Sequence, residues 1–133
     1  MINVSVIFLF NLQKQVLLQL RDNDLNIKHP NTWGPLGGHC MENETTIECA
    51  KREFFEESGY QCGNVNFYDN YMLPYEKNIF HQVSVYWSIF DYKQQINCFE
   101  GQKIEFIPMS QLNKINISNK NKTIIKLISK LII

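Results

Sequence analysis

The charged run between Gly37 and Tyr60, GGHCMENETTIECAKREFFEESGY, holds the side chains best placed to do chemistry. Glu56 and Glu57 follow Glu53 by three and four residues, a spacing that places all three carboxylates on one side of a helix. Carboxylates gathered in this way repel one another unless a cation lies among them. Carboxylate oxygens are ligands that suit Mg²⁺ or Mn²⁺. We therefore predict a site for a divalent cation, Mg²⁺ or alternatively Mn²⁺.

A helix must carry these carboxylates, and the sequence predicts where it begins and ends. Asn43 or Thr45 can cap its N-terminus, because their side chains accept hydrogen bonds from free backbone N–H groups. Gly59 is typical of the residue that ends a helix. We expect the helix to run from about Thr45 to Ser58.

The same helix must also pack against the rest of the protein. Ile47, Ala50 and Phe54 share one stripe at helical spacing and are expected to face the core. Before the helix, Gly37 and Gly38 allow the backbone to come close to a ligand. The helix can thus pack inward while it presents its carboxylates to a cleft.

Segments rich in β-branched and aromatic residues predict a sheet that supports this helix. The predicted strands or extended pieces are Ile2–Phe10, Gln15–Leu20 (paired with the first as a hairpin), Trp33–Leu36, Val65–Leu73, Ile79–Phe90 and Lys103–Ile107. A turn is expected at Pro74–Asn78, a short helical turn at Ser110–Asn113 and a final helix at Asn119–Ile133. This order indicates an α+β or mixed α/β fold in one domain, residues 1–133.

Composition narrows the classes of function. The 13 basic and 13 acidic residues balance, so net charge offers no argument for binding a polymeric nucleic acid or a membrane. The four cysteines form no C-x-x-C pair, which favours reduced thiols in a cytoplasmic protein over a zinc site or disulfides. The apolar segments at the two ends are too short to span a bilayer.

The spacing of the charged run resembles the Nudix box, the signature of the Nudix hydrolases. The matching positions are Gly38, Glu44, Arg52, Glu53, Glu56, Glu57 and Gly59. The sequence departs from the usual pattern at Tyr60, where most members have an aliphatic residue, and at Leu36, where many have proline. The resemblance implies a three-layer α/β/α sandwich around a mixed sheet.

The resemblance also implies how the metal is held. Its ligands would be Glu53, Glu56, Glu57 and the backbone carbonyl of Gly37. Arg52 would orient a carboxylate, with Glu48 or Glu56 in helical reach and Glu44 as another partner.

A general base and a phosphate-binding residue complete the implied site. The base is Glu53 or a glutamate from a distant loop, for which Glu100 is the first candidate and Glu76 the second. Arg21, at the end of the second strand, stands where many relatives hold a basic residue that binds phosphate.

Some aromatic residues and histidines could contact the substrate. Trp33, Tyr86 and Trp87 could stack on a base, although aromatic residues in strands more often belong to the core. Among the histidines, we single out His81, which is expected on a central strand near the cleft.

The implied reaction is metal-dependent hydrolysis of a nucleoside diphosphate linked to another group. Because the chain is short and adds no domain for a large leaving group, we expect a nucleoside triphosphate, modified or not, cleaved to the monophosphate and pyrophosphate. Two alternatives stay open: a nucleoside diphosphate sugar such as ADP-ribose, and a non-catalytic module that binds nucleotides. Many family members are dimers, which leaves a homodimer open.

Overall fold

The computed structural model describes residues 1–132. The central strand of its sheet is β1 (Ile2–Phe10), which pairs with three other strands. It runs parallel to β6 (Ile79–Ile89) along its whole length. On its other side it pairs antiparallel first with β4 (Leu36–His39) and then with β2 (Gln15–Leu20). The predicted hairpin of the first two strands is confirmed, and the sheet is mixed.

Three further strands extend the sheet. The order across it is β3-β2-β1-β6-β5, with β3 at Trp33–Gly34 and β5 at Asn66–Glu76. The strand β7 (Lys103–Pro108) pairs antiparallel with β2. The predicted piece Trp33–Leu36 is therefore two strands, β3 on β2 and β4 on β1.

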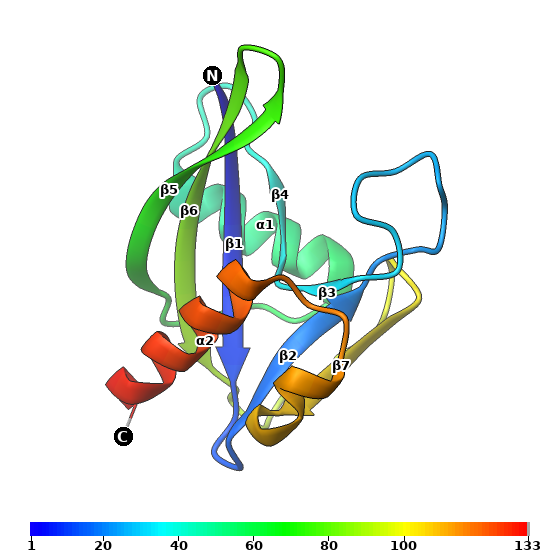
Figure 1. Ribbon diagram of the computed structural model, residues 1–133. Helices are drawn as coiled ribbons and strands as arrows, with labels where there is room; N and C mark the ends of the chain where they lie inside the picture. Colours follow the sequence, from blue (N-terminus) through cyan, green and yellow to red (C-terminus); the bar gives the residue numbers. More distant parts are fainter. Residues whose placement is uncertain (133) are drawn as a thin grey trace.

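Helices cover both faces of this sheet (Figure 1). Helix α1 (Thr46–Ser58) packs on one face, while α2 (Asn119–Ile132) crosses the other. The short 3₁₀ helix η1 (Met109–Lys114) follows β7, where a helical turn was predicted. The three-layer α/β/α arrangement expected from the resemblance is confirmed. The last residue of the predicted final helix, Ile133, lies outside the described residues.

Two apolar cores lie on the two faces of the sheet. Along β1, Phe8 and Phe10 point into the core under α2, whereas Ile7 and Leu9 point into the core under α1. All four are buried, because alternate side chains of a covered strand meet opposite layers. This explains why the first strand is apolar throughout rather than alternating.

The edge strand β5 is longer than predicted. It continues through Pro74 to Glu76, and the turn to β6 is confined to Lys77 and Asn78. Proline lacks an N–H group to donate, but an edge strand tolerates this because one of its sides needs no partner. The expected turn at Pro74 was wrong for this reason.

Within residues 1–132, no helix has the length and apolar character needed to cross a membrane.

Candidate active site

The N-terminus of α1 is closed by a reciprocal pair of hydrogen bonds. The Thr45 hydroxyl accepts from the Glu48 N–H at 3.2 Å, and the Glu48 carboxylate accepts from the Thr45 N–H at 2.9 Å. At the other end, Gly59 adopts a left-handed conformation with φ of 74° and donates its N–H to the carbonyl of Phe55. The predicted helix is confirmed, with Thr45 rather than Asn43 as its cap. Glu48 is occupied in this capping box, so it is not a partner of Arg52.

The buried stripe of α1 differs from the prediction at one end and gains an acidic residue at the other. Ala50 and Phe54 are fully buried, as expected, but Ile47 is 36% exposed. In the first turn it is Thr46 that reaches the sheet, through a 2.6 Å hydrogen bond with the Tyr86 hydroxyl. Glu57 continues the stripe and is only 5% exposed.

Arg52 joins the acidic residues that surround it. Its guanidinium donates to both oxygens of Glu44, at 2.6 and 3.0 Å, in a bidentate pair. This contact lowers the pKa of the Glu44 carboxyl to about 2. The same guanidinium donates to Glu53 at 3.0 Å and to Glu56 at 2.9 Å. Of the expected partners, Glu44 and Glu56 are confirmed, and Glu53 is added.

The glycine pair lies directly under two glutamates of the helix. A Cβ atom on Gly38 would lie 2.5 Å from the carboxylate carbon of Glu53. The backbone N–H of Gly37 donates to Glu57 Oε1 at 2.9 Å. Position 38 must therefore be glycine if Glu53 is to keep its place, and position 37 uses its backbone to hold Glu57.

A distant loop brings a further carboxyl group to Glu57. The backbone N–H groups of Asn97 and Phe99 donate to the carbonyls of Ser58 and Glu57, which ties this loop to the end of α1. As a result, the Glu100 carboxyl lies against that of Glu57. Burial first, and then the Glu100 carboxyl, raise the pKa of Glu57 to about 10. The first candidate for a distant acidic residue thus lies beside the helix carboxylates.

The donor set fits a hard divalent cation in its chemistry. Glu53 lies beside Gly38, Glu57 beside Gly37 and Glu100 beside Glu57. Among residues 1–132, the buried Glu57 forms no ion pair. Within residues 1–132, however, no three acidic, histidine or cysteine side chains are already close enough to form a ready ligand set. Two of the helix carboxylates, those of Glu53 and Glu56, instead accept hydrogen bonds from Arg52.

Comparison with known proteins agrees with this geometry. Residues 1–128 match the NUDIX domain. The chain belongs to the Nudix hydrolase family. A segment of 56 residues is 41% identical to the m7GpppN-mRNA hydrolase NUDT17 of Xenopus laevis, covering 42% of this chain and 19% of that protein. The chain thus matches about a fifth of the length of this curated relative.

Solved structures with the same fold are more distant in sequence. The NUDIX domain of Shewanella oneidensis NrtR, solved with ADP ribose, superposes with a TM-score of 0.82 at 14% identity, over 98% of this chain and 88% of that one. The MutT protein of Bacillus halodurans gives a TM-score of 0.78 at 18% identity, over 95% of this chain and 80% of that one. At such identities the likeness shows the fold alone.

Arg21, Trp33 and Glu76, which the sequence also singled out, make contacts outside the Nudix box. Arg21 donates Nε–H to the carbonyl of Lys28 at 2.9 Å and so braces the loop that follows β2. Trp33 is half-buried and packs on the core under α2. Glu76 is exposed at the end of β5. The structure therefore brings Glu100, and not Glu76, to the box.

His81 lies in a cluster of rings that sequence reasoning missed. Tyr75 stacks on it at 4.3 Å between ring centroids, and His39 meets it edge-on at 5.3 Å. Its Nε2 atom is buried and has no hydrogen-bond partner within the described part of the chain. Burial and the neighbouring His39 lower the pKa of His81. Tyr75 gave no local signal, because it falls in the segment predicted as a turn.

Proposed function

We propose that this Nudix domain is a metal-dependent pyrophosphohydrolase that cleaves a nucleoside diphosphate linked to another group. The observation that carries the proposal is the contact of buried Glu57 with both Glu100 and the Gly37 N–H group. A buried carboxyl group is costly to ionise unless a cation joins it. Glu57, held by the Gly37 backbone and beside the exposed Glu100 from a distant loop, supports a cation-dependent site.

The ligands we propose are those that the resemblance to the Nudix box implies, and the positions of Glu57 and Gly37 support them. Glu53, Glu56 and Glu57, with the carbonyl of Gly37, would hold Mg²⁺, or alternatively Mn²⁺. When bound, the cation would neutralise negative charge on the phosphate oxygens. Without this neutralisation, the polyanionic substrate repels the attacking oxygen. Arg52 positions Glu53 and Glu56 by its hydrogen bonds, and Glu44 holds Arg52 from the far side.

A carboxylate of the protein accepts the proton of the attacking water. Water adds to a phosphorus atom of the anhydride, the bridging P–O bond breaks, and the proton of the water passes to a carboxylate. Glu53 and Glu100 are the two candidates for this general base, because Glu53 is one of the helix carboxylates and Glu100 lies beside another, Glu57. The products are two phosphate compounds, one of which takes the former bridging oxygen.

We propose a nucleoside triphosphate as the substrate, cleaved to the monophosphate and pyrophosphate. The alternative is a nucleoside diphosphate sugar, which is favoured by the likeness in fold to a NUDIX domain solved with ADP ribose.

Incubation of the purified protein with Mg²⁺ and a panel of both substrate classes tests the proposal. Release of pyrophosphate from a triphosphate supports the first candidate, whereas release of a sugar phosphate from ADP-ribose supports the second. A protein that binds a nucleotide but shows no metal-dependent turnover on any panel member is a non-catalytic module.

A further inference from the structure

Two cysteine thiols meet beneath the first turn of α1, where the chain passes from β4 into the helix. The Cys40 thiol lies 3.3 Å from the Ser5 hydroxyl, and the Cys49 thiol donates to the carbonyl of Gly38 at 3.6 Å. Ser5 and Gly38 are paired residues of β1 and β4, so both thiols lie at one place on the sheet. They are neighbours there, and both are free.

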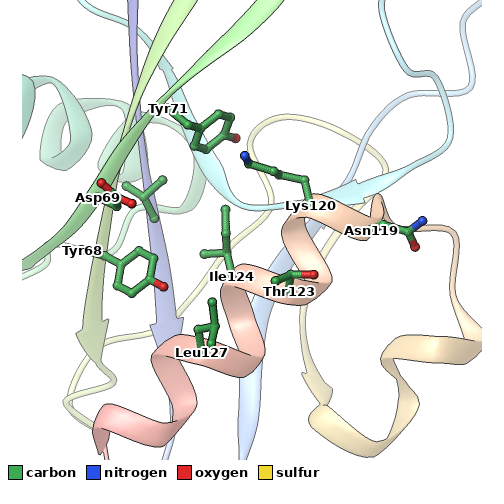
Figure 2. A pocket seen from close by; sticks show the side chains of 9 residues that line it. Tyr68, Asp69, Tyr71, Asn119, Lys120, Thr123, Ile124 and Leu127 are labelled. Atoms are coloured by element: carbon green, nitrogen blue, oxygen red, sulfur yellow. The ribbon is translucent and has the colours of Figure 1, made fainter.

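The two thiols differ in their access to solvent. Cys49 is fully buried, whereas Cys40 is partly exposed. Burial first, and then Cys40, raise the pKa of Cys49 to about 12, so Cys49 is a thiol rather than a thiolate near neutral pH. The groove of about 400 Å³ between β5 and α2 lies on the opposite face of the sheet (Figure 2). A reagent therefore reaches the thiol pair from the surface at Cys40.

The other two cysteines lie in different surroundings. Cys98 is exposed, and its thiol donates to the carbonyls of Glu100 and Gly101. Cys62 is buried in the core under α1. Cys40 is thus a partly exposed thiol with a second thiol beside it, and Cys98 provides an exposed cysteine for comparison.

The segment that contains the two cysteines also holds Arg52. Arg52 donates to the carbonyl of His39, the residue before Cys40, at 3.1 Å, and to both oxygens of Glu44, which lies between Cys40 and Cys49 in the chain. An S–S bond is about 2 Å long, which is shorter than any contact between two free thiols. Closing this bond therefore draws the two ends of the segment together and moves the groups that hold Arg52.

We propose that Cys40 and Cys49 form a modification site, which hydrogen peroxide oxidises to a disulfide. In the first step the Cys40 sulfur attacks a peroxide oxygen, the O–O bond breaks, and Cys40 becomes a sulfenic acid while the second oxygen leaves as water. In the second step the Cys49 sulfur attacks the Cys40 sulfur, the S–O bond breaks, and the hydroxyl group leaves as water with the Cys49 proton. Overall the thiols lose two electrons and two protons, which the peroxide gains.

Peptide mapping tests the site itself and does not depend on the proposed function. The protein is treated with hydrogen peroxide, free thiols are blocked, and the chain is cleaved after glutamate. Because three glutamates lie between Cys40 and Cys49, cleavage separates the two cysteines unless a disulfide joins their peptides. We expect the joined peptides from wild type and from the control Cys98→Ser. A disulfide from Cys40 to another cysteine, or none at all, would overturn the site.

A trapping experiment tests the order of the two steps. In Cys49→Ser the sulfenic acid of Cys40 lacks the thiol that would attack it, so dimedone is expected to label Cys40. In Cys40→Ser the buried Cys49 is expected to stay unlabelled. Label on Cys49, or none on Cys40, would contradict Cys40 as the residue that the peroxide oxidises first.

Turnover tests the consequence of the disulfide, which rests on the proposed function. We expect oxidation of wild type to lower kcat about tenfold, because groups displaced by about 1 Å cost this much or more, and dithiothreitol to restore it. Cys40→Ser should keep its kcat under peroxide. A disulfide that forms without loss of kcat would overturn its coupling to Arg52. Absence of turnover in the reduced protein would instead count against the proposed function, while the peptide map still decides the site.

Discussion

The carboxyl group of Glu100 lies against that of Glu57, although one comes from a loop before β7 and the other from the last turn of α1. Two features hold the pair in place: the backbone hydrogen bonds of Asn97 and Phe99 to the end of α1, and the Gly37 N–H group that donates to Glu57. A buried acid next to another acid is unfavourable for the protein alone.

Replacement of the buried acid tests the metal site directly. Glu57→Gln keeps the size of the side chain and its capacity to accept the Gly37 N–H bond, but the amide cannot ionise to bind a cation. We expect turnover in Mg²⁺ to fall by roughly 10²-fold or more, with the circular dichroism spectrum unchanged. Turnover close to wild type would remove Glu57 from the ligand set.

The raised pKa of Glu57 predicts how the stability of the metal-free protein depends on pH. The carboxyl has a pKa near 4.5 when unfolded and about 10 when folded, so the folded state retains a proton that the unfolded state loses. Its contribution to stability is complete below pH 4.5 and is lost as pH rises toward 10. We expect the free energy of unfolding in EDTA to fall with a slope of at most about 1.4 kcal/mol per pH unit from this group.

Urea unfolding at several pH values measures this slope. Glu57→Gln should flatten it, because the amide does not titrate, and should make the metal-free protein more stable than wild type at pH 8. Glu100→Gln should flatten it in part, because it removes the second cause of the raised pKa. An unchanged slope in Glu57→Gln would show that other groups control the pH dependence.

The close approach of Glu53 to Gly38 predicts the effect of adding a single methyl group at position 38. Gly38→Ala places a Cβ atom 2.5 Å from the Glu53 carboxylate, which must then move away. We expect about a tenfold loss of kcat, since a ligand displaced by about 1 Å costs this much or more. Gly63→Ala is the matched control, because nothing lies within 4 Å of a Cβ added there. Equal activity of the two variants would count against a role for Glu53.

The geometry of Arg52 predicts that lysine cannot replace it. Its planar guanidinium bonds Glu44, Glu53 and Glu56 together, whereas an ammonium group lacks the fork that binds Glu44 through two parallel bonds. Arg52→Lys should lower kcat about tenfold through the mispositioned glutamates. The control is Glu48→Gln, which alters a carboxylate of the capping box on the same helix and should reduce stability slightly while kcat is kept. Full activity of Arg52→Lys would contradict a positioning role.

Local sequence was sufficient for most of the secondary structure. The bounds of β1 and β2 agree with the prediction, and α1 begins and ends where its cap and its glycine place it. These signals are local: apolar runs, a capping threonine and a left-handed glycine act within a few residues. Pro74 misled the prediction because whether a strand tolerates proline depends on its being an edge strand, which is a property of the sheet.

The sequence alone determined that Glu53, Glu56 and Glu57 share one face of a helix, because helical spacing is built into the order of residues. It also indicated the Nudix family, through the spacing of the charged residues and glycines. The tertiary structure decided that Glu57 is buried, since burial depends on what packs against a helix. It also decided that Glu100 rather than Glu76 joins the box, and that the thiols of Cys40 and Cys49 meet beside Ser5 of β1. Each of these depends on contacts between segments far apart in the chain, and no local pattern records such contacts.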